Sequence, residues 1–377
     1  MSIIVKEVTT NKELKAFINL PYRLYKDHPY YVPPLSFDEM GTLRKDKNPA
    51  FDYCEAKYFL AYKEGRVVGR IAAILNHAFI EKWKNKYMRF GWIDFEEDIE
   101  IPKALLGEVE KWAKEKQMDA IHGPMGFTDL DHEGMLVQGF DQLGTLAAIY
   151  NYAYYPKFME ELGFTKDADW VEYKIRIPKT IPPHFEKMAS IVKRRLKLTV
   201  VQAKKPKEIL PYTKELFELI NSCYSHLYGV VPLTDKQIDY YTKQYFSFIK
   251  TEFVPLIIDE NGKLIAFGVT MPSLSKALQK AKGSLLPFGL FHLLGALKKG
   301  KNNLADLYLV AVDKAYQGKG VNALIMYECN KAFIDYGMDY AESNPELEVN
   351  EKVQAFWDRF DAVQHKRRRA FIKRLDS

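Results

Sequence analysis

One short segment of the chain combines the residue types that suit a phosphate-bearing ligand. It reads Gln317-Gly-Lys-Gly-Val-Asn322 and follows an apolar run at 305–312, which predicts a strand covered on both faces. Apolar residues then recur at helical spacing and predict a helix over 319–336. Gly318 and Gly320 carry no Cβ, so the backbone of the turn can approach a ligand closely. Because a helix begins at this turn, its free N–H groups suit a pyrophosphate.

The turn is too short for a GxxxxGK[ST] nucleotide loop and does not read GxGxxG. It resembles motif A of the GNAT acyltransferases, whose turn reads (Gln/Arg)-x-x-Gly-x-(Gly/Ala), although Asn322 stands where that family prefers a small residue. The resemblance implies that acetyl-CoA or another acyl-CoA is the cofactor. The residues that it implies for binding are Val310, Val312, Gln317, Gly318, Lys319, Gly320, Val321, Asn322 and Asn350. Asn350 opens the next predicted helix, where a simple N-cap is the alternative role.

Acyl transfer from a thioester to an amine needs a neutral amine, a stabilised oxyanion and a proton for the departing thiolate. The resemblance implies a splayed strand pair, and the strand that ends at 341–344 carries Glu342, our predicted base. A solvated glutamate at a strand end is the alternative. The tyrosine that often serves as the acid in the family would fall at Trp357, and an indole cannot donate a usable proton to a thiolate. Tyr308 is the predicted substitute, with Tyr316 as a second candidate and packing as the alternative role for both.

Two distant pairs of segments indicate an internal duplication. Predicted hairpins at 60–70 and 256–266 place their turn glycines, Gly65 and Gly262, 197 positions apart. Farther along, Phe158 and Phe356 lie in similar segments 198 positions apart. The nearly equal offsets favour duplication over chance.

We therefore expect an α/β (mixed α+β) fold of two tandem GNAT-like domains, 1–178 and 179–377. Each domain should hold a mixed, mostly antiparallel twisted sheet flanked by helices. Three prolines near residues 178–184 mark the boundary. The expected strands are 3–8, 57–76 (a hairpin), 87–95, 119–123, 167–177, 198–203, 253–271 (a hairpin), 305–312, 339–343 and 362–374. The expected helices are 11–26, 102–117, 154–162, 184–197, 206–225, 234–248, 319–336 and 350–359.

The first half lacks the glycine turn. Its counterpart reads Glu96-Glu-Asp-Ile-Glu100, with four carboxylates and no glycine. Such a segment repels a pyrophosphate and presents no row of free amides. We predict that the first half is a degenerate copy and that the chain has one cofactor site.

Two polar clusters have several interpretations. Asp129, Asp131, His132 and Glu133 lack the second histidine or helical spacing of a metal site, and we predict no metal. A substrate-facing loop and ordinary loop bonding remain the alternatives. The basic run Lys366–Arg369 lies on the predicted last strand, which favours a solvated face. No aromatic stacking pattern accompanies it, which argues against nucleic-acid binding.

The second half carries an insertion at 273–301 that the first half lacks. It contains the apolar run Leu285–Leu297, which is flanked by lysines and too short to span a bilayer. An interface between the halves, a membrane surface and a pocket beside the thioester are the alternatives for burying it. Because the run is apolar nearly all round, we expect burial within the protein, where it would cover the substrate site.

Composition sets the remaining limits. The three cysteines lie far apart with no CxxC, so a metal knuckle or disulfide framework is not expected, and reduced thiols fit a cytoplasmic protein. The net charge of +6 suits an anionic cofactor. We predict a cytoplasmic, acyl-CoA-dependent N-acyltransferase, an acetyltransferase by preference, that acts on a small-molecule or peptide amine. The alternatives are a non-catalytic acyl-CoA or metabolite-binding protein and an aminoacyl-transfer enzyme that uses charged RNA. The oligomeric state cannot be predicted from this sequence.

Overall fold

The computed structural model describes residues 2–245 and 249–375. The first half of the chain alternates strands with short helices. Its elements are β1 (Ile4–Glu7), α1 (Asn11–Leu24), α2 (Ser36–Leu43), β2 (Cys54–Lys63), β3 (Arg66–Asn76), α3 (His77–Trp83), β4 (Tyr87–Phe95), α4 (Glu100–Glu115), β5 (Ala120–Gly123), β6 (Met135–Gln138), α5 (Tyr154–Glu161) and β7 (Thr165–Arg176).

The second half repeats this order and adds two helices before its central strand. Its elements are α6 (Pro183–Arg195), β8 (Thr199–Val200), α7 (Thr213–Tyr224), α8 (Asp235–Tyr245), β9 (Leu256–Ile258), β10 (Leu264–Pro272), α9 (Ser275–Ala281), α10 (Gly289–Ala296), β11 (Leu304–Val312), α11 (Val321–Asp335), β12 (Tyr340–Ser343), β13 (Glu346–Leu347), α12 (Glu351–Trp357) and β14 (Ala362–Arg374).

Most predicted elements are present, and β4 and β14 have the bounds that the sequence predicted. The helix predicted from residue 206 is wrong in its first part, where two 3₁₀ turns precede α7. The end predicted for the helix at 234–248 lies outside the described residues. Several short elements were not predicted. One of them, α3, begins where the Asn76 side chain accepts the N–H of Phe79, a local cap with little apolar periodicity behind it.

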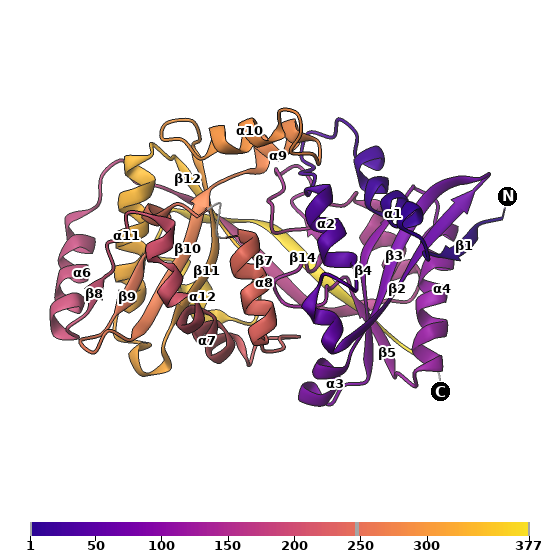
Figure 1. Cartoon of the computed structure of the whole chain (residues 1–377), viewed down its shortest axis with the longest axis horizontal. Coiled ribbons are helices and arrows are strands. Elements are labelled where there is room, and N and C mark those ends of the chain that lie inside the picture. Colours follow the sequence, from indigo (N-terminus) through magenta and orange to yellow (C-terminus); the bar gives the residue numbers. More distant parts are fainter. Residues whose placement is uncertain (1, 246–248, 376–377) are drawn as a thin grey trace.

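The described strands form a 14-stranded sheet that runs through the molecule between flanking helices (Figure 1). Its main path has the order β1-β2-β3-β4-β5-β14-β7-β12-β11-β10-β9-β8. Only β4–β5 and β11–β12 are parallel pairs among these strands, which confirms a mixed, mostly antiparallel sheet. The order reads the same from both ends if each strand is replaced by its counterpart in the other half. This symmetry fits the internal duplication.

The last strands of the two halves are exchanged. β14, the final strand of the chain, pairs with β5 in the first half, and β7 pairs with β12 in the second half. The side chains follow the strands, since Phe371 of β14 packs in the core of the first half and Ile175 of β7 packs in the core of the second. The proposed boundary at residue 178 thus divides the sequence, while the sheet crosses it in both directions.

The basic run on β14 is not a solvated face, and that prediction is wrong. The side chains of Lys366 and Arg368 are each 1% exposed. Lys366 is bonded to Glu342 of β12, and Arg368 is bonded to Glu172 of β7. Buried charges require partners of this kind, because an unpaired ion in a protein interior is very costly. These bonds therefore link β14 to β12 and β7.

The insertion at 273–301 forms α9 and α10, and the prediction that its apolar run is buried is wrong for half of its surface. Leu293 and Leu297 are buried against Val32 and Leu35 of the first half. Leu285 is partly buried against the same cluster, while Phe288 and Phe291 are 67% and 70% exposed. Figure 1 shows the two helices at the top edge of the molecule, where the halves meet.

Candidate active site

The two parallel strands β11 and β12 separate at one point and leave a free strand edge. Their register runs from Leu304 beside Tyr340 to Leu307 beside Ser343 and then ends. Beyond it, β13 continues along β7, while β11 continues along β10. The register of β11 with β10 also shifts here, because Val269 lies beside Leu309 and Thr270 beside Leu307, which is the geometry of a β-bulge. A bulge changes the direction of the residues that follow it, and here those residues form the end of β11 beside the opening.

At this edge the backbone of β11 beyond the bulge is bonded to side chains and not to a neighbouring strand. The Val310 N–H donates to the hydroxyl of Tyr224 on α7 at 3.3 Å, and the same hydroxyl donates to the Val310 carbonyl at 2.9 Å. The Val312 carbonyl accepts from the Cys223 thiol and from the Gln317 amide. The Val310 side chain is 51% exposed, so the edge is open to solvent. Both strand residues predicted to bind a cofactor therefore present backbone groups to the opening.

The glycine turn follows directly, and its shape depends on both glycines. Gly318 and Gly320 have φ angles of +72° and +87°, which side-chain-bearing residues rarely adopt. A Cβ on Gly320 would lie 2.9 Å from Cγ2 of Val192 on α6. Gly320 is the N-cap of α11 and offers no side chain, so the first amides of this helix have no side-chain cap. Lys319, Val321 and Asn322 complete the turn and the first residues of the helix.

Basic side chains surround the turn. A hollow between α6 and the turn is lined by His184, Lys187, Met188, Ile191, Val192, Arg195, Lys319 and Gly320. The Arg195 guanidinium donates to the Lys319 carbonyl at 3.1 Å, which ties α6 to the turn. Free amides, a helix N-terminus and three fixed positive charges fit the phosphates of coenzyme A.

A carboxyl group that the sequence did not single out lies on the other side of the opening. Glu346 of β13 accepts a hydrogen bond from the Trp357 indole at 2.9 Å. Burial raises the pKa of Glu346 to about 7, and the indole bond opposes that rise. Burial raises the pKa of Tyr224, and the charges of Asp129 and Glu346 add to that rise. A carboxyl half-buried at an opening and titrating near neutrality has the properties of a general base.

The two predicted catalytic residues lie deeper. Glu342 is 4% exposed and is bonded to Lys366; burial raises its pKa, but bonds to His365 and Lys366 outweigh burial and lower it overall. Tyr308 lies at the bulge, and its hydroxyl donates to Asp306 at 3.1 Å. Asn350 is the N-cap residue of α12 but makes no capping bond through its side chain. The catalytic roles of Glu342 and Tyr308 stay predictions.

Known proteins share this architecture. Residues 213–361 match the model of the acetyltransferase (GNAT) family. A tandem GNAT protein from the clavulanic acid biosynthesis pathway superposes with a TM-score of 0.58 at 12% identity, covering 100% of this chain and 99% of the other. Residues 213–361 therefore form a GNAT-family domain, and the chain as a whole has the fold of a tandem GNAT protein. The motif A resemblance and the predicted fold are thereby confirmed.

Two curated proteins resemble this chain along nearly its whole length. Protein YghO of Escherichia coli K12 is 28% identical over 377 residues, covering 99% of this chain and 95% of the relative. The bacterial ceramide synthase of Caulobacter vibrioides is also 28% identical, over 98% of this chain and 96% of the relative. The similarity spans both GNAT halves.

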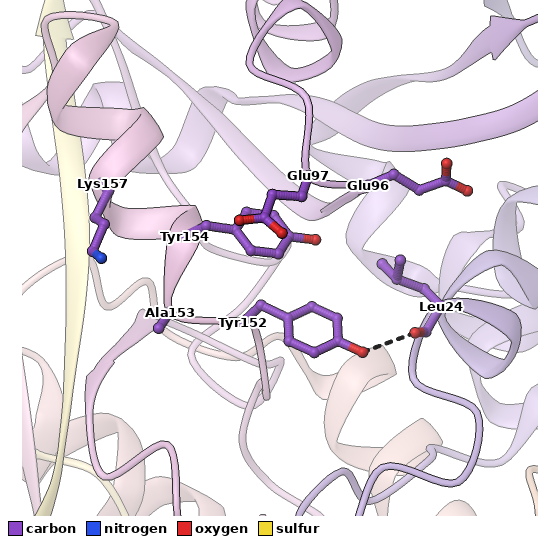
Figure 2. Close-up of a pocket in the computed structure, with 7 residues that line it drawn as sticks. All are labelled: Leu24, Glu96, Glu97, Tyr152, Ala153, Tyr154 and Lys157. Atoms are coloured by element: carbon purple, nitrogen blue, oxygen red, sulfur yellow. Dashed lines mark hydrogen bonds between the residues drawn. The ribbon is translucent and has the colours of Figure 1, made fainter.

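The corresponding strand edge in the first GNAT half is closed. The Phe95 N–H donates to the Tyr155 hydroxyl, the Phe95 carbonyl accepts from the Tyr154 hydroxyl, and the Tyr155 ring stacks on Phe95 at 4.0 Å. Phe95 and Tyr155 are fully buried, in contrast to Val310. Figure 2 shows the hollow beside this edge, which Glu96 and Glu97 line where the second half has its glycine turn. Tyrosines and carboxylates thus occupy the positions that an anionic cofactor would need.

The acidic loop at 129–133 lies between the GNAT halves. The Asp131 carboxylate accepts the N–H groups of Phe127 and Thr128 at 2.8 and 3.0 Å, which is ordinary loop bonding. Burial raises the pKa of both Asp129 and Asp131 to about 6. Within residues 2–245 and 249–375, no group of three or more histidine, cysteine or acidic side chains is arranged to hold a metal ion.

Proposed function

We propose that this protein is an acyl-CoA-dependent N-acyltransferase and that its acceptor is a long-chain, lipid-like amine. The observation that carries the proposal is the splayed edge of β11, which leads into the glycine turn and its basic hollow. The likeness to a bacterial ceramide synthase over both halves supports a lipid amine as the acceptor. This replaces the broader expectation of a small-molecule or peptide amine.

Two surfaces of the second half would hold acyl-CoA. The backbone groups of Val310 and Val312 would pair with its extended amide-bearing arm, as a neighbouring strand would. The turn Gln317–Asn322 would receive the pyrophosphate, and Lys187 and Arg195 would neutralise further phosphate charge. Bound acyl-CoA supplies the activated acyl group. Tyr224 would give up its bonds to Val310 when this edge is occupied.

Two side chains at the opening would move the protons. Glu346, as the carboxylate, would accept a proton from the attacking amine. Tyr224 keeps its proton at neutral pH because burial and nearby carboxylates raise its pKa, so it can donate that proton to the leaving thiolate. Tyr224 would thus do the work of the tyrosine that Trp357 replaces. Trp357 itself would orient Glu346 through its indole bond.

We expect one coenzyme A to bind per chain, since only the second half has an open edge and a glycine turn. Gly320→Glu should abolish binding, because it adds a negative charge and forces a side chain against Val192. Isothermal calorimetry with acetyl-CoA measures both results. Gly107→Glu is the matched control, since it adds the same charge to an exposed position of α4 with nothing within 4 Å of a new Cβ. Two equivalent sites, or normal binding by Gly320→Glu, would contradict the assignment.

The reaction itself is tested by supplying acyl-CoAs of increasing chain length with two amines, a sphingoid base and a short-chain amine. We expect release of free coenzyme A together with an N-acyl product of the sphingoid base, detected by mass spectrometry. Transfer to the short amine alone would contradict the lipid acceptor. Tight coenzyme A binding with no product from any pair would favour the non-catalytic acyl-CoA-binding alternative.

A further inference from the structure

The exposed side of α10 and the loop before it carry a concentrated apolar surface. We call this surface the α10 patch; its side chains are 39–78% exposed, and its members are Leu286, Phe288, Leu290, Phe291 and Leu294. Exposed apolar side chains scattered singly are normal on soluble proteins, but a contiguous group marks an interaction surface. Two phenylalanines at its centre add the large contact area typical of such surfaces.

Contacts on the buried side of α10 and α9 hold the patch in place. Leu293 and Leu297 are buried between α9 and the first-half segment that contains Val32 and Leu35. The Gln279 amide of α9 donates to the carbonyls of Pro29 and Tyr31, and the Ser36 N–H donates to the Gly283 carbonyl. The helix therefore has its own apolar anchor and presents the α10 patch outward, as its position at the edge of the molecule in Figure 1 suggests.

Positive charge flanks the patch in the sequence. Residues 271–305 contain no aspartate or glutamate, and they contain six exposed lysines, Lys276, Lys280, Lys282, Lys298, Lys299 and Lys301. Lys299 pairs with Asp335, while the other five form no ion pair with any described residue. An exposed apolar segment flanked on both sides by unpaired lysines is complementary to the surface of an anionic bilayer.

We propose that the α10 patch docks the protein on an anionic phospholipid membrane, with Phe288 and Phe291 entering the interface and the lysines contacting headgroups. No helix among the described residues is long and apolar enough to cross a membrane, so the contact is peripheral. A second copy of the chain fits less well. A two-fold contact through this patch would bring the flanking lysines of the two copies together, and like charges oppose such a contact.

Membrane docking would serve the proposed function, and only this benefit of docking rests on that proposal. The insertion joins β10 directly to β11, and the Ser273 N–H donates to the Leu304 carbonyl at the start of the splayed strand. A lipid amine and a long acyl chain partition into bilayers, so docking would bring the active site to its substrates.

The test is flotation of the full chain with vesicles, without acyl-CoA, so that its outcome does not depend on catalysis. We expect binding to vesicles of equal parts phosphatidylcholine and phosphatidylglycerol, and weaker binding to pure phosphatidylcholine, by roughly fivefold for each lysine engaged. Phe288→Ser/Phe291→Ser should lose binding by at least about tenfold. Lys298→Glu/Lys301→Glu should lose the preference for anionic vesicles.

Leu210→Ser/Val363→Ser is the matched control, because it removes two exposed apolar side chains elsewhere on the surface. It should bind vesicles as the parent does. A Phe288→Trp variant adds a direct reading, since its fluorescence should shift to the blue on vesicle addition. The proposal is overturned if the double phenylalanine variant floats normally, or if it only converts a dimer into a monomer in light scattering.

Discussion

Replacing Glu346 by glutamine is expected to reduce kcat by about 10²–10⁴-fold, the range for loss of a general base. The carboxyl has its pKa raised to about 7 by burial, so the parent enzyme should become more active as pH rises through that value and the carboxylate forms. Glutamine keeps the shape and cannot accept the proton. The variant should therefore lose this rising limb of the pH–rate profile, in which activity increases as the carboxylate forms. Its kcat should fall as well.

A second buried carboxyl makes the control essential. Asp306 also has a pKa of about 7, raised by burial and by the nearby charge of Glu342. It is 3% exposed, whereas Glu346 is only half-buried. Asp306→Asn should keep the limb. If the limb persists in Glu346→Gln and disappears in Asp306→Asn or Glu342→Gln, Glu346 is not the base.

Trp357 offers a finer check on the same pair. Its indole bond to Glu346 favours the carboxylate and holds the pKa below the value that burial alone would give. Trp357→Phe should move the limb to higher pH while leaving the rate at its plateau close to normal. A positioning role predicts this shift, and a role in packing alone does not.

Replacing Lys366 by methionine is expected to lower the free energy of unfolding by about 3–5 kcal/mol, because it leaves a buried carboxylate without its cation. Lys366 is 1% exposed and bonds Glu342, with Glu172 at 3.7 Å. Urea denaturation followed by circular dichroism measures the loss. The double variant Lys366→Met/Glu342→Gln should recover part of it, since the unpaired charge is then removed.

The control lies on the same strand. Lys373 pairs with Glu110, and both side chains are partly exposed, at 33% and 26%. Lys373→Met should therefore cost only about 0–1 kcal/mol, as is usual for surface ion pairs. Equal losses in Lys366→Met and Lys373→Met would mean that the buried network contributes no more than a surface pair.

Local patterns in the sequence predicted the fold better than the site. The apolar run of β11, the two glycines of the turn and the helix behind them are set by neighbouring residues, and each appeared where it was expected. Glu346 escaped notice because β13 has two residues and its importance comes from Trp357, eleven positions later. Its pKa depends on burial, which no local pattern encodes.

Partners from distant strands account for the other errors. The basic run on β14 looked solvated because its acceptors, Glu172 and Glu342, lie on strands that the sequence alone does not pair with it. The apolar run at 285–297 looked buried because hydrophobicity gives no direction. Only the packing of Leu293 and Leu297 against the first half decides which side of α10 faces water.

The exchange of β7 and β14 bears on how this chain is made. The first half reaches its natural end at residue 176, yet its sheet lacks the strand beside β5 until residues 362–374 have been synthesised. Until then, the free edge of β5 and the core position of Phe371 remain unfilled. We therefore expect the two halves to complete their folding together, after the last strand has been synthesised. A gene split at the proposed boundary would yield two fragments that complete each other only when both are present.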